Sequence, residues 1–315
     1  MPELAVGGRQ WSVPAACNLL DALREGGVAV PYSCRAGSCH ACLVRCVRGE
    51  PVDAKPEALQ GALRDAGWRL ACQCRVEGDL QVEVFEPLRD GLPARVEGCD
   101  WLSGEVLRLR LVPERPLRYR AGQHLVLWSH DGVARPYSLA SLPGVDPWLE
   151  FHLDCRPAGA FSEVARRLQV GDGLRLGELR GGALHYDCDW QARPLWLLAA
   201  GTGLAPLYGV LREALRQEHQ GPIRLIHLAA QAEAHYLKGP LQALAEEHPQ
   251  LQVDYWTAAE LTAALAELRL VSRQTLALLC GHPNSVDAFA RRLYLAGLPR
   301  NQLFTDLFLP RAGPA

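Results

Sequence analysis

The sequence lacks the features that would place it outside ordinary globular proteins. Its longest uncharged stretch, 194–211, is interrupted by Gly-Thr-Gly and contains two prolines, which suits a strand, a tight loop and a helix better than a membrane span. The first residues have neither the basic flank nor the apolar core of a signal peptide. No internal repeat or low-complexity tract is present. We therefore expect a cytoplasmic protein with no membrane partner.

An excess of basic charge is also absent. The chain has 33 Lys and Arg against 35 Asp and Glu, and the two signs are nearly balanced in each third, so we expect no nucleic-acid partner. Eleven cysteines in 315 residues are too few for a disulfide scaffold. Six of them fall between positions 34 and 74, which in a reducing compartment favours metal binding. The length predicts two or three domains.

Hydrophobic patterning divides the chain into three parts, of which residues 1–88 are the first. A helix is predicted at 18–24, with Leu19, Leu20 and Leu23 on its apolar side. A cysteine-rich loop follows, and alternating apolar residues predict a half-buried strand at 80–85. The segment 86–98 has two prolines, two glycines and five charges, which predicts a linker.

The other two parts of the chain differ from each other in the period of their hydrophobic residues. Residues 93–190 contain strand-like segments at 107–111, 124–128 and 149–154 with frequent turns, which favours a small antiparallel barrel with one helix at 161–168. From 193 to 315, buried strands at 195–200, 223–230, 251–256 and 275–281 alternate with helical stretches at 205–216, 240–248, 259–269 and 285–297. This alternation predicts a parallel α/β sheet covered on both faces.

The cysteine-rich loop carries the most specific motif. PYSCRAGSCHAC places thiols at Cys34, Cys39 and Cys42, and Cys72 follows after 29 intervening residues. Four thiolates suit a 2Fe–2S cluster, and the small residues between them let backbone N–H groups approach the sulfurs. The alternative is a structural zinc site that uses Cys46 as its fourth ligand, but three cysteines crowded into one loop fit zinc poorly.

Residues 1–88 resemble a plant-type 2Fe–2S ferredoxin, a domain of β-grasp fold. The resemblance rests on PYSCRAGSC, the two-residue step after it and the long gap to Leu-Ala-Cys. It implies that the metal ligands are Cys34, Cys39, Cys42 and Cys72. Asp79, seven residues after Cys72, matches the family and favours Cys72 over Cys74. Cys46 and Cys74 are then expected to be buried packing residues, and His40 a solvated loop residue.

The barrel carries Arg-Pro-Tyr-Ser within 134–141, preceded by Tyr119–Gln123 and followed by a predicted helix start at Gly159–Ser162. Free N–H groups at a helix start and a nearby guanidinium suit a pyrophosphate. This arrangement resembles the antiparallel six-stranded FAD-binding β-barrel of the ferredoxin–NADP reductase superfamily. The resemblance implies that Arg135 holds the FAD diphosphate, Tyr137 stacks on the isoalloxazine and Ser138 lies near flavin N5. It also places Pro136, Gly159, Ala160, Phe161 and Ser162 in the FAD site.

The third part carries two nucleotide motifs. A strand runs into Gly201-Thr202-Gly203, and a helix with Pro206 in its first turn follows. Glycines here let the backbone approach a pyrophosphate, although the pattern is not G-x-G-x-x-G. This loop resembles the nicotinamide loop of the same superfamily, which implies a Rossmann-like domain that binds NAD(P) through Gly201, Thr202, Gly203 and Pro206. Cys280-Gly281-His-Pro resembles the superfamily's segment bordering the nicotinamide, but Ser285 stands where methionine is usual.

The aromatic that covers the other flavin face in this superfamily is matched by Phe308, with Phe304 as the alternative. The resemblance thus implies Ser138, Cys280 and Phe308 as candidate catalytic residues, and Cys280 and Gly281 as cofactor contacts. After the second strand of the third part, Gln231 and Glu233 precede the first cation, Lys238, which favours NADH over NADPH.

The resemblance implies an NAD(P)H-dependent oxidoreductase that passes electrons from NADH through FAD to the cluster, because nicotinamide gives two electrons together and the cluster takes one. The order of domains looks like that of reductase components of bacterial dioxygenases and multicomponent monooxygenases, which implies an oxygenase component as acceptor. One alternative is a reductase for a dehydratase of the CDP-6-deoxy-glucoseen type. Another is a redox sensor without turnover, against which the intact motifs argue.

Overall fold

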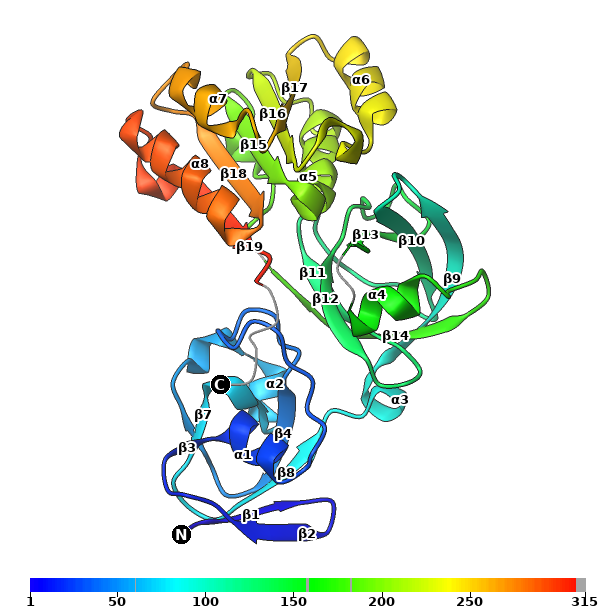
Figure 1. Cartoon of the computed structure of the whole chain (residues 1–315), viewed down its shortest axis with the longest axis vertical. Helices are drawn as coiled ribbons and strands as arrows, with labels where there is room; N and C mark the ends of the chain where they lie inside the picture. The colour runs from blue at the N-terminus through cyan, green and yellow to red at the C-terminus, as the bar shows by residue number, and fades with distance from the viewer. Residues whose placement is uncertain (60, 157–158, 182, 310–315) are drawn as a thin grey trace.

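The computed structural model describes residues 1–59, 61–156, 159–181 and 183–309. Three large sheets follow one another along the described part of the chain, and we use the predicted ranges 1–88, 93–190 and 193–315 for the N-terminal, middle and C-terminal domains. In Figure 1 the middle domain lies between the other two on one side of the molecule. Among the described residues, no helix has both the length and the apolar character needed to cross a bilayer.

The N-terminal domain is a five-stranded mixed sheet with a helix packed on it. The sheet order is β2-β1-β8-β4-β6, with β1 and β8 parallel. Its strands are β1 (Glu3–Val6), β2 (Arg9–Ser12), β4 (Leu43–Arg48), β6 (Trp68–Leu70) and β8 (Leu80–Val84). A smaller sheet joins β3 (Cys17–Asn18), β7 (Cys74–Val76) and β5 (Val52–Asp53). The short helical turns are η1 (Pro56–Ala58), α2 (Ala62–Asp65) and η2 (Ala71–Gln73).

Helix α1 (Leu19–Glu25) forms where the sequence predicts a helix. Asn18 Oδ1 caps it by accepting hydrogen bonds from the backbone N–H groups of Leu20 (3.1 Å) and Asp21 (3.4 Å). Leu19, Leu20 and Leu23 are fully buried. The Asn18 side chain also donates to the carbonyl of Cys72 at 3.0 Å, so the cap of this helix holds the backbone of a predicted cluster ligand.

The middle domain is a six-stranded antiparallel sheet in the order β12-β11-β14-β9-β10-β13. Its strands are β9 (Leu92–Trp101), β10 (Val106–Pro113), β11 (His124–Trp128), β12 (Ala134–Ser138), β13 (Leu149–Asp154) and β14 (Gly173–Arg180). A bridge between Leu139 and Phe151 joins the two ends of this order, so the sheet curls as predicted for a barrel. Helix α4 (Ala160–Ala165) is shorter than predicted.

The predicted linker at 86–98 is too long. Helix α3 (Pro87–Asp90) occupies its first half, and strand β9 begins at Leu92. The reason is visible in the burial of this segment: Ala94 and Val96 alternate into the barrel core at 6% and 0% exposure. A period of two therefore outweighs the Pro and Gly signals there.

The C-terminal domain is a five-stranded parallel sheet, β17-β16-β15-β18-β19, between two layers of helices (Figure 1). Its strands are β15 (Leu195–Ala200), β16 (Ile223–Ala229), β17 (Leu251–Thr257), β18 (Leu276–Gly281) and β19 (Leu303–Leu307). Helices α5 (Leu204–Arg216) and α6 (Lys238–Glu247) pack on one face, and α7 (Leu261–Glu267) and α8 (Pro283–Leu295) on the other. The turns η4 (Gly201–Gly203), η5 (Ala232–Ala234) and η6 (Arg300–Gln302) complete it, and η3 (Cys188–Trp190) ends the middle domain just before it.

Both domain boundaries are packed. Phe85 of the N-terminal domain stacks on Trp128 of the barrel, with ring centroids 5.1 Å apart and 24° between the planes. On the other side, Arg212 of α5 donates to both carboxylate oxygens of Asp146 at 2.7 and 2.9 Å. Gly209 lets α5 lie against the barrel, because a Cβ there would be 3.2 Å from the carbonyl oxygen of Ala140. These contacts fix both outer domains on the barrel.

Candidate functional site

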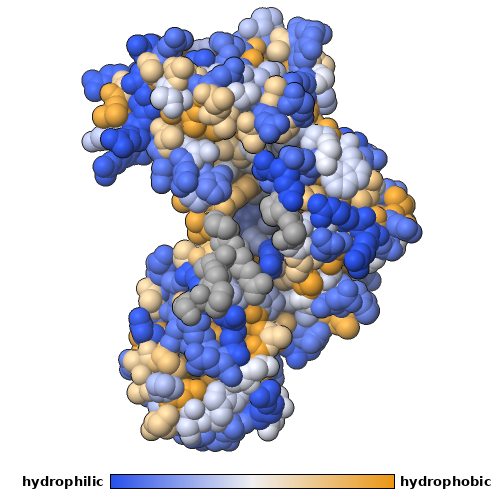
Figure 2. Space-filling view, in the orientation of Figure 1, coloured by the Kyte–Doolittle hydropathy of each residue, from blue (hydrophilic) through white to orange (hydrophobic). Residues whose placement is uncertain are grey.

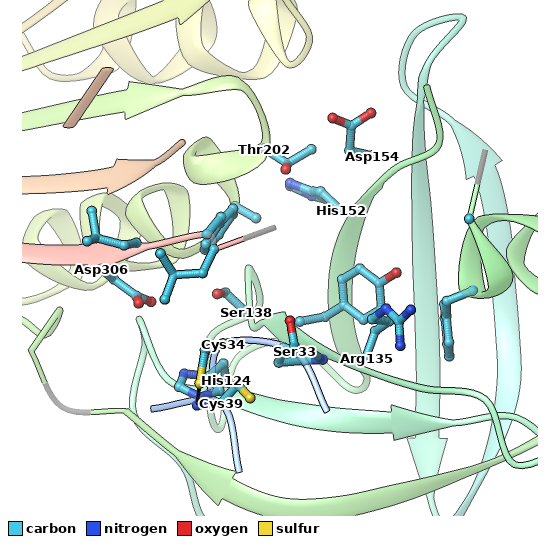
Figure 3. Close-up of a pocket in the computed structure, with 18 of the residues that line it drawn as sticks. Ser33, Cys34, Cys39, His124, Arg135, Ser138, His152, Asp154, Thr202 and Asp306 are labelled. Carbon is cyan, nitrogen blue, oxygen red and sulfur yellow. Dashed lines mark hydrogen bonds between the residues drawn. The ribbon is translucent and has the colours of Figure 1, made fainter. Parts of the chain in front are cut away.

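A cavity of about 270 Å³ lies where the three domains meet (Figure 3). The surface view shows this place as a hollow at the waist of the molecule (Figure 2). The N-terminal domain contributes Ser33, Cys34, Ser38 and Cys39. The barrel contributes His124, Arg135, Pro136, Tyr137, Ser138, His152, Asp154, Gly159, Ala160, Phe161 and Ser162. The C-terminal domain contributes Thr202, Ala205, Asp306, Leu307, Phe308 and Leu309.

The predicted site residues divide into two groups. All eight predicted FAD contacts line the cavity, together with Cys34, Cys39, Thr202 and Phe308. The remaining predicted site residues do not line the cavity, and they are Cys42, Cys72, Gly201, Gly203, Pro206, Cys280 and Gly281. The structure thus brings one predicted motif from each domain to a common space.

The four predicted cluster ligands meet as two interacting pairs of thiols. Cys34 and Cys39 share a hydrogen bond, which lowers the pKa of Cys34, and Cys42 and Cys72 are paired in the same way, which lowers the pKa of Cys72. The backbone N–H groups of Ala36 and Cys39 point at Cys34 Sγ from 3.3 and 3.4 Å. Soft donors surrounded by N–H groups fit a 2Fe–2S cluster.

A side chain that the motif did not indicate also contacts this group. Gln73 Nε2 lies 3.1 Å from Cys72 Sγ and 3.0 Å from the carbonyl oxygen of Arg35. Gln73 packs on Gly37, whose φ of +79° suits glycine, and a Cβ at Gly37 would be 3.1 Å from Gln73 Cγ. Gln73 therefore joins the cysteine loop to the fourth predicted ligand.

Two further cysteines of the N-terminal domain, Cys46 and Cys74, lie outside this loop. Cys46 sits on β4 opposite Val82, near the charges of Arg69 and Glu50, and burial raises its pKa to about 11. Cys74 is fully buried, and burial raises its pKa. These thiols are packing residues, and the surroundings of Cys46 do not favour the zinc alternative.

His40 differs from its prediction as a solvated residue. It is 7% exposed with φ of +56°, and its Nδ1 lies 3.9 Å from a carboxylate oxygen of Glu178 on β14. The cause is tertiary: the barrel covers this side of the cysteine loop.

The flavin side of the cavity is formed by β12 and the start of α4. Tyr137 packs against Phe161 with ring centroids 5.1 Å apart, and burial raises the pKa of its phenol. Arg135 precedes it on β12 and Ser138 ends the strand at 7% exposure. An aromatic face, a guanidinium and a hydroxyl on one strand suit a ring with a charged tail, so these residues fit FAD.

The nucleotide side is formed by the loop η4 at the end of β15. A Cβ on Gly203 would overlap the carbonyl oxygen of Cys280, and one on Gly281, at φ of +132°, would overlap that of Ala200. Only glycine lets these two strand ends approach each other. The result is a closely packed edge of the parallel sheet, where such folds bind nucleotides.

The two candidate aromatics have different surroundings. Phe304 packs against Trp190 with centroids 5.2 Å apart, in the core of the C-terminal domain. Phe308 lines the cavity, and its backbone N–H donates to the carbonyl of Gly281 at 2.8 Å. This placement supports Phe308.

Sequence reasoning missed several polar residues of the cavity: Ser33, His124, His152, Asp154 and Asp306. Burial raises the pKa of Asp306, against the opposing effect of nearby His124, and burial lowers the pKa of His124. A signal existed for two of them. In strand 149–154 the apolar face was recognised, and His152 and Asp154 alternate on the other face.

Comparison with known proteins bears on each domain. Residues 5–77 match the family described as the 2Fe-2S iron-sulfur cluster binding domain, and residues 197–291 match the oxidoreductase NAD-binding domain. The chain is 32% identical to the ferredoxin–NAD(P)+ reductase component of a naphthalene 1,2-dioxygenase system from Pseudomonas putida, over 98% of this chain and 99% of that protein. It is 34% identical to the reductase subunit of an aromatic O-demethylase from Amycolatopsis, over 78% of this chain and 77% of the relative.

A solved structure extends the likeness to the whole molecule. A cytochrome P450 reductase from Amycolatopsis superposes with a TM-score of 0.68 at 27% identity, over 99% of this chain and 100% of that one. The chain therefore belongs to the ferredoxin–NAD(P) reductase superfamily, among the reductases that carry an N-terminal 2Fe–2S domain. It is an iron–sulfur flavoprotein oxidoreductase whose cofactors are NAD(P)H, FAD and a 2Fe–2S cluster, and it transfers electrons in that order.

Proposed function

We propose that this chain is the reductase component of an oxygenase system and that its cluster, held by Cys34, Cys39, Cys42 and Cys72, delivers electrons to the oxygenase component. Three observations support the proposal. The cavity collects residues from all three domains. The thiols form two pairs with N–H groups around them. Of the relatives named above, one is the reductase component of a dioxygenase system and another is the reductase subunit of an aromatic O-demethylase.

The barrel residues hold FAD in this proposal. When bound, FAD accepts a hydride and releases electrons singly, which is the chemistry that the protein side chains cannot supply. Arg135 pairs with its diphosphate, together with the N–H groups at the start of α4, and Pro136 to Ser138 line the ring. Tyr137 is held in place by Phe161, which keeps its ring face available for stacking.

The C-terminal residues bind and orient the nicotinamide. Gly201 to Gly203 and Pro206 form the loop for the pyrophosphate, and Cys280 and Gly281 end the neighbouring strand. Phe308 covers the ring side of the cavity and must move for the nicotinamide to reach it. The bond from Phe308 to Gly281 on β18 is made by the backbone, so the side chain can turn without breaking it.

We also infer a preference for NADH over NADPH. Gln231 and Glu233 follow β16, where NADPH enzymes commonly place a cation for the 2′-phosphate. The first cation, Lys238, donates to the carbonyl of Ala232 at 3.3 Å and lies over the ring of Tyr255. The carboxylate of Glu233 repels the 2′-phosphate of NADPH, and Lys238 is already held by its contacts with Ala232 and Tyr255. We therefore expect kcat/KM for NADH to exceed that for NADPH.

Purified holoprotein tests the proposal. In the presence of the holoprotein, NADH should reduce cytochrome c and should drive product formation when an oxygenase component is added. If the cofactors are bound but NADH reduces no acceptor, the alternative function of a redox sensor without turnover would be favoured. Reduction of cytochrome c without coupling to the oxygenase, but with coupling to a deoxysugar dehydratase, would assign the other partner.

A further inference from the structure

His152 is a buried residue of the cavity that no role assigned above uses. It lies on β13, is 3% exposed and lines the cavity. Figure 3 shows it next to Thr202, above Ser138. Its Nδ1 is buried and has no hydrogen-bond partner among the residues that the structure describes. Leaving a buried polar atom unpaired is unfavourable, and a bound ligand that donates to it would relieve that cost.

The contact of Nε2, the other ring nitrogen, determines which of the two nitrogens of His152 carries the proton. His152 Nε2 is 3.1 Å from one carboxylate oxygen of Glu150, and Arg110 Nε donates to the other at 2.8 Å. Burial opposes the ionisation of Glu150, but these two partners outweigh it and lower its pKa to about 2. A carboxylate only accepts hydrogen bonds, so Nε2 donates. Burial also lowers the pKa of His152, so the ring is neutral and Nδ1 presents a lone pair.

The surroundings hold the ring in this orientation. The backbone N–H of Glu150 donates to Ser141 Oγ at 3.0 Å, and the hydroxyl of Tyr119 donates to the same oxygen at 2.8 Å. The ring of Tyr236, which is 2% exposed, meets His152 edge-on at 5.3 Å between centroids. Rotation of the imidazole would break its bond to Glu150 inside a packed wall.

The position of His152 indicates which end of a bound cofactor it meets. Phe151 bridges to Leu139, which directly follows Ser138, and the turn η4 contacts β13 from the C-terminal domain. His152 therefore stands between the residue placed at the flavin ring and the nicotinamide loop. Of the predicted diphosphate residues, Arg135 lies three positions before Ser138 on β12, and the others lie at the start of α4.

We propose that His152 is a cofactor-binding residue whose Nδ1 accepts a hydrogen bond from an amide-type N–H group at the meeting point of the two redox rings. Two donors have this chemistry: the imide N3–H of the flavin and the carboxamide NH₂ of the nicotinamide. The proposal rests on the proposed function, because both groups belong to its cofactors, and it adds the contact that orients one of them.

Two variants of His152 and one control distinguish the contributions of the two ring nitrogens to cofactor binding. His152→Gln keeps a group near Nε2 for Glu150 and removes the acceptor at Nδ1. His152→Asn places its amide oxygen near Nδ1 and loses the contact with Glu150. His130→Gln, on an exposed turn of the same domain, is the matched control.

Two binding measurements identify the donor without turnover. In the first, apoprotein is titrated with FAD and with N3-methyl-FAD, followed by flavin fluorescence. In the second, oxidised holoprotein is titrated with NAD⁺ and with its 3-acetylpyridine analogue, which lacks the NH₂ group, followed by difference absorbance. The wild type should bind the analogue that lacks the donor roughly tenfold more weakly than the natural cofactor.

His152→Gln should bind the natural cofactor roughly tenfold more weakly and lose the discrimination, and His152→Asn should recover part of it. The pair that shows this pattern identifies the donor. If the wild type binds each analogue as tightly as the corresponding natural cofactor, the proposal is overturned even if no variant folds. Equal losses of cofactor affinity in His152→Gln and His152→Asn also overturn it. A wild type that binds neither FAD nor NAD⁺ overturns the proposed function itself.

Discussion

The hydrogen bond from Gln73 to Cys72 should set part of the reduction potential of the cluster. The Nε2–Sγ distance is 3.1 Å, and the same amide donates to the carbonyl of Arg35, so the donor is held in place by two contacts. Reduction adds one negative charge to the cluster, and an N–H group aimed at a ligand sulfur stabilises that charge. Gln73→Met removes the donor and keeps most of the side-chain volume that packs on Gly37.

The size of the effect follows from one hydrogen bond. A loss of about 1 kcal/mol in the reduced state corresponds to roughly 40 mV for a one-electron couple, so the potential should become more negative by about that amount. A redox titration with mediator dyes, followed by the electron paramagnetic resonance signal of the reduced cluster, measures it. Gln81→Met, exposed on β8, is the control. An unchanged or more positive potential in Gln73→Met, with the cluster fully loaded, would refute the reasoning.

Four further outcomes are expected. Cys72→Ser should abolish the visible absorption of the cluster and Cys74→Ser should leave it; the reverse pattern would overturn the ligand assignment. Arg135→Ala should weaken FAD binding roughly tenfold or more, in a fluorescence titration, without loss of iron, and unchanged affinity would remove its role. Gly203→Ala should abolish NAD⁺ binding or lower Tm by several degrees, because its Cβ overlaps a backbone carbonyl. Glu150 has a lowered folded pKa, so the stability it contributes is complete above about pH 4.5 and is lost as pH falls toward about 2; acid titrations of Tm should therefore be less steep for Glu150→Gln.

Local patterns were enough to predict the three domain types. The spacing of Cys34, Cys39 and Cys42 is a local property, because three of the four predicted cluster ligands lie within one short loop. The same holds for the alternation in 149–154 and for the strand, glycine turn and helix around Gly203. In these places the residues that decide the structure are neighbours in the sequence, so the sequence shows them directly.

Where the sequence misled, the cause was a contact between distant segments. Pro and Gly in 86–98 predicted a linker. Ala94 and Val96 are instead buried in the barrel core, and the chain forms strand β9 from Leu92. His40 was expected in solvent, but the barrel covers it and brings Glu178 to it.

By itself, the sequence determined the kinds of site in this protein, since the thiol spacing, the Arg-Pro-Tyr-Ser strand and the glycine turn each specify a ligand type within a few residues. Only the tertiary structure decided that these sites share one cavity and which other polar groups enter it. His152 and Asp306 are more than a hundred residues apart in the chain, and they line the same space because α5 and the Phe85–Trp128 stack hold the outer domains against the barrel. No local pattern encodes that packing, because it depends on how three separately patterned surfaces fit together.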